Sequence, residues 1–407
     1  MSLSKLDRAL AAEVAALERE GRAKAPERVI VDRVPERGER GPRYKLRGSD
    51  REYLRLNSNG YLSLAYHPGL AEAADAACRC LGTGPGAVRF IDGTTREHVA
   101  LEGRIAAFTG RPAARAFNSA YTSVLGLALA LSGAETYWIG DELNHNCIIR
   151  AMRIASVPRE GRAIFRHNDV DDLAVQLAQV PAGVERVVVV FDGIFSMRGD
   201  HAPLDRIAAI AREHDGRFPQ GVVTVMDDSH GLGAYGATGR GTEEHCEARA
   251  DVLVGTFGKA FGVNGGFVAG SAELVEALRQ KADTYIYTNP LGAADCAAAE
   301  RAVSLADGPE GRERLARLRA RTRELREGLA RLGLESIEGP HPVVPLLVRD
   351  TERTRALVRG LYEREILAVG LTFPVVPRGD DTIRFQVNAE HTAADIRQVL
   401  AALEGLR

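Results

Sequence analysis

The sequence predicts an α/β protein with a large domain on a mostly parallel sheet, a smaller C-terminal α/β domain and an N-terminal arm. Between about residues 62 and 269, helical patterns alternate with short apolar runs at 136–139, 186–191, 222–226 and 252–254. The run VVVV at 187–190 is apolar at every position, as in strands that helices cover on both faces. A chain of 407 residues is also too long for one ordinary core, which favours two domains.

The first 60 residues are expected to form a helix and an arm. Apolar residues recur at helical spacing between about residues 3 and 20, which predicts an amphipathic helix. They are Leu6, Leu10, Val14 and Leu17. Residues 27–55 are rich in charge, Gly and Pro, and their short apolar stretches at 29–31, 44–46 and 53–54 predict a small hairpin. We place this N-terminal unit at residues 1–60.

The alternating pattern defines a large domain, which we place at residues 61–292. Long helices are then predicted from about residue 272 and through 312–332. Short strands at 343–348 and 382–387 alternate with helices at 352–364 and 392–406, and they predict a small domain at residues 293–407. The arginines of residues 312–331 have acids among them, which favours a solvated helix face over a basic patch.

Composition narrows the possible partners. A net charge of -2 and 27% charged residues are typical of a globular protein and give no electrostatic reason to expect nucleic acid or a membrane. The five cysteines, at 78, 80, 147, 246 and 296, are an odd number, and the start of the chain has no apolar signal segment. We therefore expect a reducing, cytoplasmic setting. Cys78 and Cys80 have the wrong spacing for a zinc site, so no metal is expected.

Polar residues follow four of the apolar runs, where ligands of open α/β sheets bind. The segments are GD at 140–141 with NHN at 144–146, DGIFS at 192–196, DDSHG at 227–231 and GTFGK at 255–259. Each alone is weak, because such a carboxylate is often a helix cap and such a lysine is often only exposed. Together they supply a lysine for an imine, an acid for a pyridinium nitrogen, an imidazole for a ring face and donors for a phosphate. Pyridoxal phosphate (PLP) uses all of these groups.

These motifs also carry a family resemblance over nearly the whole chain. The chain resembles the α-oxoamine synthases, PLP-dependent enzymes of fold type I, whose large domain has a mostly parallel sheet of the seven-stranded type. The matching stretches are NGYLSL at 59–64, NH at 144–145, GIFSM at 193–197, DDSH at 227–230, GRG at 239–241 and TFGKAFG at 256–262. Within the family the chain looks most like the glycine C-acetyltransferases, also called 2-amino-3-ketobutyrate CoA ligases. That likeness is carried by PERVI at 26–30, VRFIDGT at 88–94, FPVVPRG at 373–379 and IR at 383–384.

The resemblance implies four catalytic residues around the cofactor ring. Lys259 would form the Schiff base with PLP, and Asp227 would hold the pyridinium nitrogen. His230 would hydrogen-bond the ring hydroxyl, and His145 would stack on the ring. A carboxylate at the ring nitrogen keeps it protonated, which suits an electron sink. His145 could also be a core histidine.

Further residues are implied for the phosphate and for a neighbouring subunit. Ser196 would contact the cofactor ring region, and Thr256 would bind the phosphate with the backbone N–H groups of Ala120 and Tyr121. Thr288 matches a hydroxyl that the neighbouring subunit supplies to the phosphate. The resemblance therefore implies a homodimer with a shared active site. Ser196 could instead be a helix cap.

Two residues are implied for the substrate carboxylate, Asn59 and Arg384. The planar guanidinium of Arg384 can make two parallel hydrogen bonds to a carboxylate, although this arginine could instead pair with a nearby acid. The expected reaction joins glycine, or another small amino acid, to an acyl-CoA, expected to be acetyl-CoA, and gives 2-amino-3-oxobutanoate and CoA. The amine of Lys259, made less basic by burial, would remove the Cα proton.

The acyl donor is the most open of these expectations. Residues 118–124, Gly60 and Arg198 depart from the nearest relatives, and pocket walls distinguish chain lengths only by modest apolar contributions. One alternative is a decarboxylating synthase with a longer acyl thioester, like 8-amino-7-oxononanoate synthase or serine palmitoyltransferase. Two others are a fold-type I aminotransferase and a non-enzymatic protein that keeps the fold.

Overall fold

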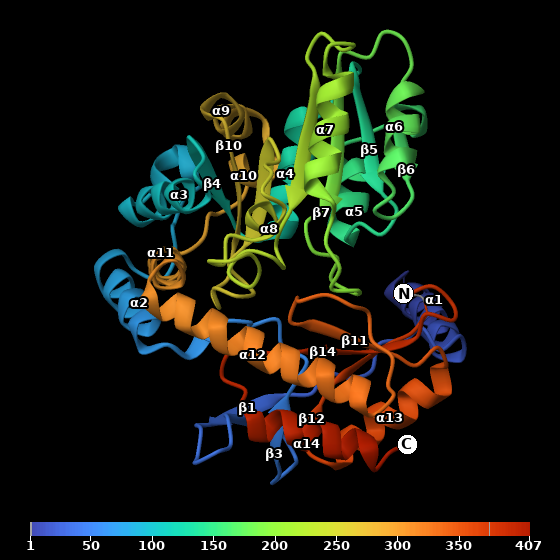
Figure 1. The fold of residues 1–407 in the computed structure, drawn as a ribbon. Helices are drawn as coiled ribbons and strands as arrows, with labels where there is room; N and C mark the ends of the chain where they lie inside the picture. Colours follow the sequence, from blue (N-terminus) through green and yellow to red (C-terminus); the bar gives the residue numbers. More distant parts are fainter. Residues whose placement is uncertain (1, 374) are drawn as a thin grey trace.

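The computed structural model describes residues 2–373 and 375–407 (Figure 1). Met1 and Pro374, the second of which falls in the FPVVPRG run, lie outside the described residues. In Figure 1, a large domain lies at the top of the view and a smaller one lies below it. The long helix α12 (Pro309–Arg331) runs between them at the front. Within the described part of the chain, no helix is both long and apolar enough to cross a membrane.

The large domain contains a seven-stranded sheet with the strand order β4-β10-β9-β8-β7-β5-β6. The strands are β4 (Ala113–Phe117), β5 (Thr136–Asp141), β6 (Arg162–Phe165), β7 (Arg186–Asp192), β8 (Val222–Asp227), β9 (Val252–Thr256) and β10 (Gly266–Gly270). Neighbours from β9 to β6 are parallel, and only β10, among these seven, runs antiparallel to its partners β9 and β4. The predicted fold class is confirmed, and all four predicted apolar runs lie in strands of this sheet.

Helices cover both faces of the sheet. They are α3 (Arg96–Thr109), α4 (Ala120–Leu131), α5 (Asn146–Ile154), α6 (Val170–Ala178), α7 (Leu204–Asp215), α8 (Thr242–Cys246), α9 (Ala272–Lys281) and α10 (Asp283–Ile286). Along β7, Val187 and Val189 enter one hydrophobic cluster, whereas Val188 and Val190 enter another. Because successive side chains of a strand point to opposite faces, both faces of β7 are buried. This is why the run has no polar residue.

The small domain has a three-stranded antiparallel sheet in the order β11-β14-β13. Its strands are β11 (Val343–Leu347), β13 (Val369–Leu371) and β14 (Thr382–Gln386), and its helices are α13 (Thr351–Glu363) and α14 (Ala393–Glu404). Helix α11 (Ala293–Asp307) packs against α2 (Pro68–Leu81) and α3. On α12, Leu315, Leu318 and Leu325 are buried, while Arg314 and Arg321 pair with acids of the same helix.

The N-terminal unit starts with helix α1 (Ser2–Arg19), whose predicted apolar stripe is exposed in this chain. Strands β1 (Ile30–Val34), β2 (Arg43–Leu46) and β3 (Glu52–Arg55) follow, and β3 also pairs with β12 (Ile366–Leu367). The predicted hairpin is thus part of a four-stranded sheet, because the free edge of β3 finds hydrogen-bond partners in the small domain. We propose three units at residues 1–60, 61–292 and 293–407, with the first packed on the third.

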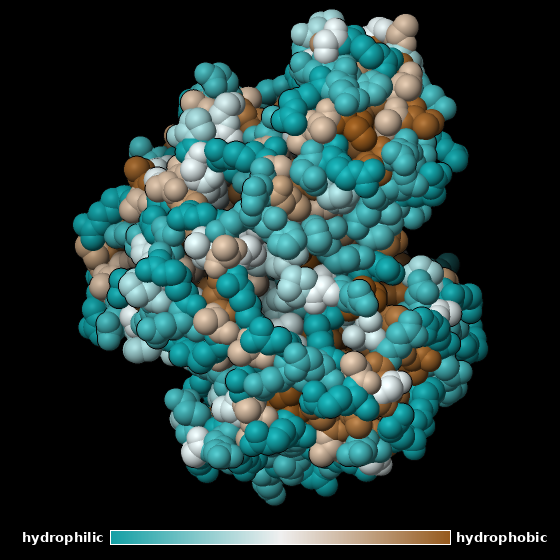
Figure 2. Space-filling model, viewed as in Figure 1, coloured by the Kyte–Doolittle hydropathy of each residue, from teal (hydrophilic) through white to brown (hydrophobic). Residues whose placement is uncertain are grey.

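Most of the face seen in Figure 2 is hydrophilic, with smaller hydrophobic patches among the polar side chains. The surface is hollowed at the right, between the large and the small domain (Figure 2).

Candidate active site

A cavity of about 230 Å³ at the carboxyl end of the sheet is lined by eight of the eleven predicted site residues. They are Ala120, Tyr121, His145, Ser196, Asp227, His230, Thr256 and Lys259. The cavity also has walls from Ser119, Cys147, Asp192, Ile194 and Ser229, which were not predicted as site residues. The fold therefore places in one cavity residues that are up to 140 positions apart in sequence, from Ser119 to Lys259.

Two carboxylates end neighbouring strands at this cavity. Asp192 is the last residue of β7 and Asp227 the last of β8, and the two are paired in register. Burial and the negative charge of Asp227 raise the pKa of Asp192 well above its usual range. Asp192 also accepts a hydrogen bond from the backbone N–H of His145 at 2.9 Å. Asp192 follows an apolar run, which is the sequence pattern that could have identified it as a site residue. The resemblance to the α-oxoamine synthases implied no role for it.

Lys259 lies in the turn between β9 and β10, and its side chain enters the cavity. Removal from water lowers the pKa of the Lys259 amine, although the charges of Asp227 and Asp192 act in the opposite direction. The turn leaves no room for a side chain at Gly262. This residue has φ +73°, and a Cβ there would lie 2.4 Å from the backbone nitrogen of Ala65. This glycine thus fixes the path of the chain that carries the lysine.

Two imidazoles flank the lysine. The Nδ1 atom of His230 lies 2.7 Å from the hydroxyl of Tyr61, and burial, followed by the charge of Lys259, lowers the pKa of His230 well below its usual range. His145 has its Nδ1 atom 3.2 Å from the backbone nitrogen of Cys147 and 3.0 Å from its Sγ atom. Burial lowers the pKa of His145 as well. Both rings are therefore neutral near pH 7.

The opposite end of the cavity is suited to an anion. Helix α4 begins at Ala120, so the N–H groups of Ala120 and Tyr121 have no acceptor within the helix. Ser119 caps the helix by accepting a hydrogen bond from the N–H of Thr122 at 3.1 Å. A Cβ on Gly266 would lie 2.2 Å from the nitrogen of Ala120, so only glycine leaves this backbone in place.

Arg384 and Asn59 do not line the cavity, but Arg384 contacts its wall from the small domain. Arg384, on β14, donates from Nη1 to the backbone carbonyl of Ser196 at 2.8 Å, and its buried Nε has no partner among the described residues. Asn59 accepts a hydrogen bond from Gln386, which lies two residues further along the same strand. β14 thus connects the two residues predicted to hold a carboxylate, and Arg384 reaches the wall of the cavity at Ser196.

Thr288 does not line the cavity of its own chain. Its Oγ1 atom lies 3.5 Å from the side-chain nitrogen of Asn118. Close to it in the sequence, Tyr287 is 76% exposed, and Phe90 and Ile91 are each more than half exposed on the segment that packs near α10. The predicted role of Thr288 in a neighbouring subunit stays a prediction, and an apolar surface lies beside it.

The residues present fit PLP. The cavity offers an acid, two neutral imidazoles, a lysine of lowered pKa and two free N–H groups at a helix N-terminus. The hydroxyl of Ser229 is buried without a hydrogen-bond partner in the described part of the chain, so a polar group remains for a ligand. Lys259 would hold the cofactor covalently, Asp227 and His230 would bind its ring, and Ala120, Tyr121 and Thr256 its phosphate.

Comparisons with known proteins agree with this fit. The model of the family "Aminotransferase class I and II" matches residues 51–403. The 8-amino-7-oxononanoate synthase of Geobacter sulfurreducens is 38% identical over 368 residues, 90% of this chain and 91% of the relative. That of Saccharophagus degradans is 36% identical over 366 residues, 89% of each chain.

Solved structures of α-oxoamine synthases are also similar to this chain. A serine palmitoyltransferase of Sphingomonas wittichii superposes with a TM-score of 0.85 at 27% identity, over 99% of this chain and 97% of that one. A variant of serine palmitoyltransferase from S. paucimobilis, with a PLP-myriocin aldimine bound, gives a TM-score of 0.84 at 28% identity, over 99% of this chain and 98% of that one.

Proposed function

The chain belongs to the α-oxoamine synthases of the class I and II aminotransferase family, and from this premise we propose that it joins a small amino acid to an acyl thioester longer than acetyl. The cofactor is PLP. When bound, PLP supplies an electron sink for the negative charge that develops on Cα of the amino acid. The residues of the cavity then have to bind the cofactor, move one proton and orient two substrates.

Lys259 would be the residue that moves the proton. Since burial lowers the pKa of its amine, a larger fraction of this amine is neutral near pH 7 and can take a proton from Cα. Asp227 would keep a proton on the cofactor ring nitrogen, and the neutral His145 would lie against the ring. His230, which Tyr61 holds through Nδ1, would present its other nitrogen to the ring hydroxyl.

Arg384 and Asn59 would orient the amino acid by its carboxylate. Arg384 uses Nη1 for the carbonyl of Ser196, so its other Nη atom remains for the substrate. Asn59 is held by Gln386 of the same strand. Because these residues belong to the small domain and to the segment that joins the arm to the large domain, binding of the carboxylate would connect the domains across the site.

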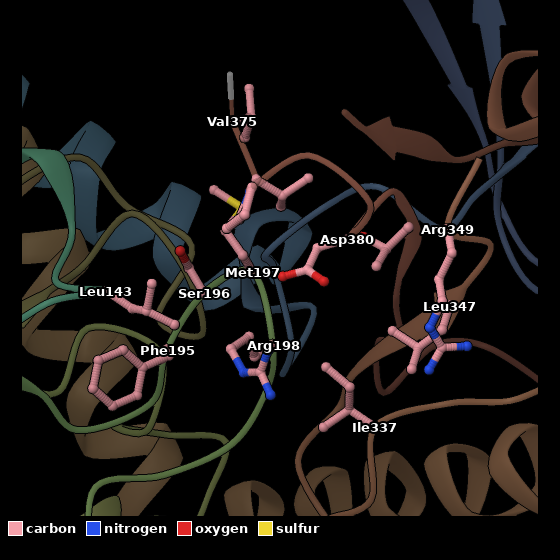
Figure 3. Close-up of a pocket in the computed structure, with 13 residues that line it drawn as sticks. Leu143, Phe195, Ser196, Met197, Arg198, Ile337, Leu347, Arg349, Val375 and Asp380 are labelled. Carbon is pink, nitrogen blue, oxygen red and sulfur yellow. The ribbon is translucent and has the colours of Figure 1, made fainter. Parts of the chain in front are cut away.

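The observation that carries the choice of acyl donor is a second, mostly apolar cavity of about 310 Å³ beside the first. Ser196 lines both cavities. Figure 3 shows Phe195 and Met197 of the large domain on one side of this cavity and Ile337 and Leu347 of the small domain on the other. The remaining walls are Leu143, Arg198, Arg349, Val375, Val376, Pro377, Asp380 and Thr382. An acyl chain bound at Ser196 would extend into this space.

The apolar walls favour a chain of several methylenes. Each buried methylene contributes about 0.8 kcal/mol, or about a fourfold gain in kcat/KM. An acetyl group has no methylene to place in this cavity. The names of the relatives, 8-amino-7-oxononanoate synthase and serine palmitoyltransferase, match the alternative considered from the sequence better than the glycine C-acetyltransferase that the sequence favoured.

A homodimer is also part of the proposal. Thr288 lies outside the cavity of its own chain, and exposed apolar side chains of Phe90, Ile91 and Tyr287 surround this region. We propose that this surface meets a second copy of the chain, and that Thr288 of each copy completes the phosphate site of the other.

The test is a panel of thioesters. The PLP-loaded protein is incubated with glycine, alanine or serine and with acyl-CoAs from two to sixteen carbons, and mass spectrometry identifies the products and any loss of CO2. We expect turnover to rise with chain length until the cavity is filled. Fast turnover of acetyl-CoA, with slower use of every longer chain, would contradict the proposal and support glycine C-acetyltransferase.

A further inference from the structure

The loop between β7 and α7 (residues 193–203) carries Ser196, and contacts hold it from two sides. On the side of the small domain, Arg384 donates to the carbonyl of Ser196. On the far side, outside both cavities, His167 lies next to Asp200 of the same loop. His167 follows β6 and has no role in the chemistry proposed above.

Both ring nitrogens of His167 face carboxylate oxygens. Nδ1 lies 3.1 Å from Oδ1 of Asp141, and Nε2 lies 3.1 Å from Oδ2 of Asp200. A neutral imidazole has only one N–H, whereas the imidazolium has two. The side-chain nitrogen of Asn168, a donor, also lies 3.3 Å from Nε2, but the contact to Asp200 is shorter. Since a carboxylate only accepts, hydrogen bonds to both Asp141 and Asp200 require a protonated ring.

The surroundings of the ring support the charged form. The side chain of Asp141 is 1% exposed and that of His167 is 14% exposed. Removal from water disfavours the imidazolium, but the hydrogen bonds to Asp141 and Asp200 outweigh this effect and raise the pKa of His167 to about 9. The other charged neighbours are Arg198, which donates to Asp200 at 2.8 Å, and Glu142, which accepts from the backbone N–H of His167 at 2.9 Å.

His167, Asp141 and Asp200 together form what we call the clamp. The clamp also contacts Phe195, the residue before Ser196. The ring of His167 meets the ring of Phe195 edge-on, with centroids 4.4 Å apart and planes at 86°. The backbone N–H of Phe195 donates to the carbonyl of Asp200 at 3.0 Å, which closes the loop on itself. Asn168, in a left-handed conformation with φ 56°, donates from its side chain to the carbonyl of His201 at 3.1 Å. One segment therefore fixes both ends of the turn that presents Ser196.

We propose that His167 is a positioning residue, which as an imidazolium between Asp141 and Asp200 fixes the loop so that Ser196 faces the cofactor and its carbonyl holds Arg384. The inference rests on the proposed function, because Arg384 is taken to bind the carboxylate of the amino acid. Loosening the loop would let Ser196 and Arg384 move together. A displacement of about 1 Å at such a contact can cost as much as about 100-fold in reactivity.

The test compares His167→Gln with the wild-type protein in two measurements that need no acyl donor. The first is the Kd of glycine, alanine or serine for the PLP-loaded protein, which is measured from the change in the cofactor's absorbance as the amino acid is added. We expect the Kd to rise by about tenfold or more, while the affinity for PLP stays near wild type. The midpoint of urea unfolding should fall, because Asp141 loses a buried partner, and the same unfolding curve shows whether the variant is folded under the conditions of the binding assay. The second is hydrogen exchange of the cofactor-free protein, in which a peptide covering residues 193–203 should exchange faster in the variant.

His214→Gln is the matched control, because His214 contacts Arg217 near the end of α7 and lies away from the cavity. Asp200→Asn removes the charge but keeps the shape of the side chain, and it replaces His167→Gln if that variant does not fold. An unchanged Kd with unchanged exchange in residues 193–203 would overturn the inference. So would a loss of global stability that accounts for the whole change in Kd. A wild-type protein that binds amino acids but transfers no acyl group would refute only the proposed function.

Discussion

The cofactor cavity and the second cavity, which we call the acyl cavity after its proposed role, share Ser196 but are built in opposite ways. In the first, polar side chains stand at the ends of β7, β8 and β9, and neighbours in the sheet hold them. In the second, apolar side chains come from the loop after β7, from β11 and from the segment before β14. Under the proposed function, the rigid sheet would set the chemistry, whereas loops between the domains would set the substrate length.

The two kinds of wall should also respond differently to mutation. A buried polar group that loses its partner costs about 1 to 3 kcal/mol, and a charged one costs more. One methylene more or less in an apolar pocket changes binding by about 0.8 kcal/mol. Mutations in the cofactor cavity should therefore stop the reaction, while mutations in the acyl cavity should change its substrate.

The largest effect is expected for Lys259→Ala. Among the described residues that line the cavity, Lys259 is the only lysine, so removal of the Cα proton should slow by at least about 10³-fold. Single-turnover rates, measured by mass spectrometry of the product, would show the loss, even if PLP still binds without a covalent bond. Lys281→Ala, at the exposed end of α9, is the control and should keep full activity. Substantial turnover by Lys259→Ala would mean that another residue is the base.

The paired carboxylates give the next largest effect. Asp227→Asn should lower kcat/KM by about 10²-fold, because the cofactor ring loses its charged partner. Asp192→Asn should change it by less than about threefold: burial and Asp227 raise the pKa of Asp192, so the neutral amide resembles the protonated acid. Steady-state kinetics of both variants would measure the two losses in kcat/KM. Equal losses would show that Asp192 also acts as an anion.

His341 provides a test of the contact between the two domains. Its Nε2 donates to the carbonyl of His230 at 3.0 Å, and its Nδ1 accepts from the N–H of Val343 at 3.1 Å. Burial lowers the pKa of His341 to about 3, below its value of about 6.5 in the unfolded chain. Stability from this residue is therefore present above pH 6.5 and is lost as the pH falls toward 3, by at most about 1.4 kcal/mol for each pH unit.

Urea unfolding of the wild-type protein and of His341→Gln, at pH 7, 6 and 5, would measure this contribution. The free energy of unfolding should fall less steeply with acid in the variant, and His214→Gln should behave like wild type. Parallel pH profiles for wild type and His341→Gln would show that folding does not lower the pKa of this ring.

The smallest effect is expected in the acyl cavity. Leu347→Trp should fill part of the space next to Ile337, so the preferred acyl chain should become shorter, with about a fourfold change in relative kcat/KM for each methylene excluded. Competition between two acyl-CoAs in one reaction would measure the ratio. Ile164→Trp, at a position that is 64% exposed, is the control. An unchanged ratio in Leu347→Trp would place the acyl chain elsewhere.

Local sequence patterns determined much of the fold and the core of the site. The run at 187–190 predicted a strand buried on both faces, and the structure divides its valines between two hydrophobic clusters. Polar residues after the apolar runs predicted one binding edge, and Asp227, Thr256 and Lys259 line one cavity there. Local patterns could predict the strand and the shared edge because side-chain alternation and strand ends depend only on residues adjacent in the chain, while the binding role of that edge stays a prediction.

Contacts between distant residues were decided by the tertiary structure alone. The pairing of β3 with β12 turned a predicted hairpin into part of a larger sheet. Asp141, His167 and Asp200 form their clamp only because β5, β6 and the loop after β7 end side by side. The proposed acyl cavity is lined by residues of both domains. No periodicity specifies such contacts, because they depend on how whole elements pack and not on the order of neighbouring residues.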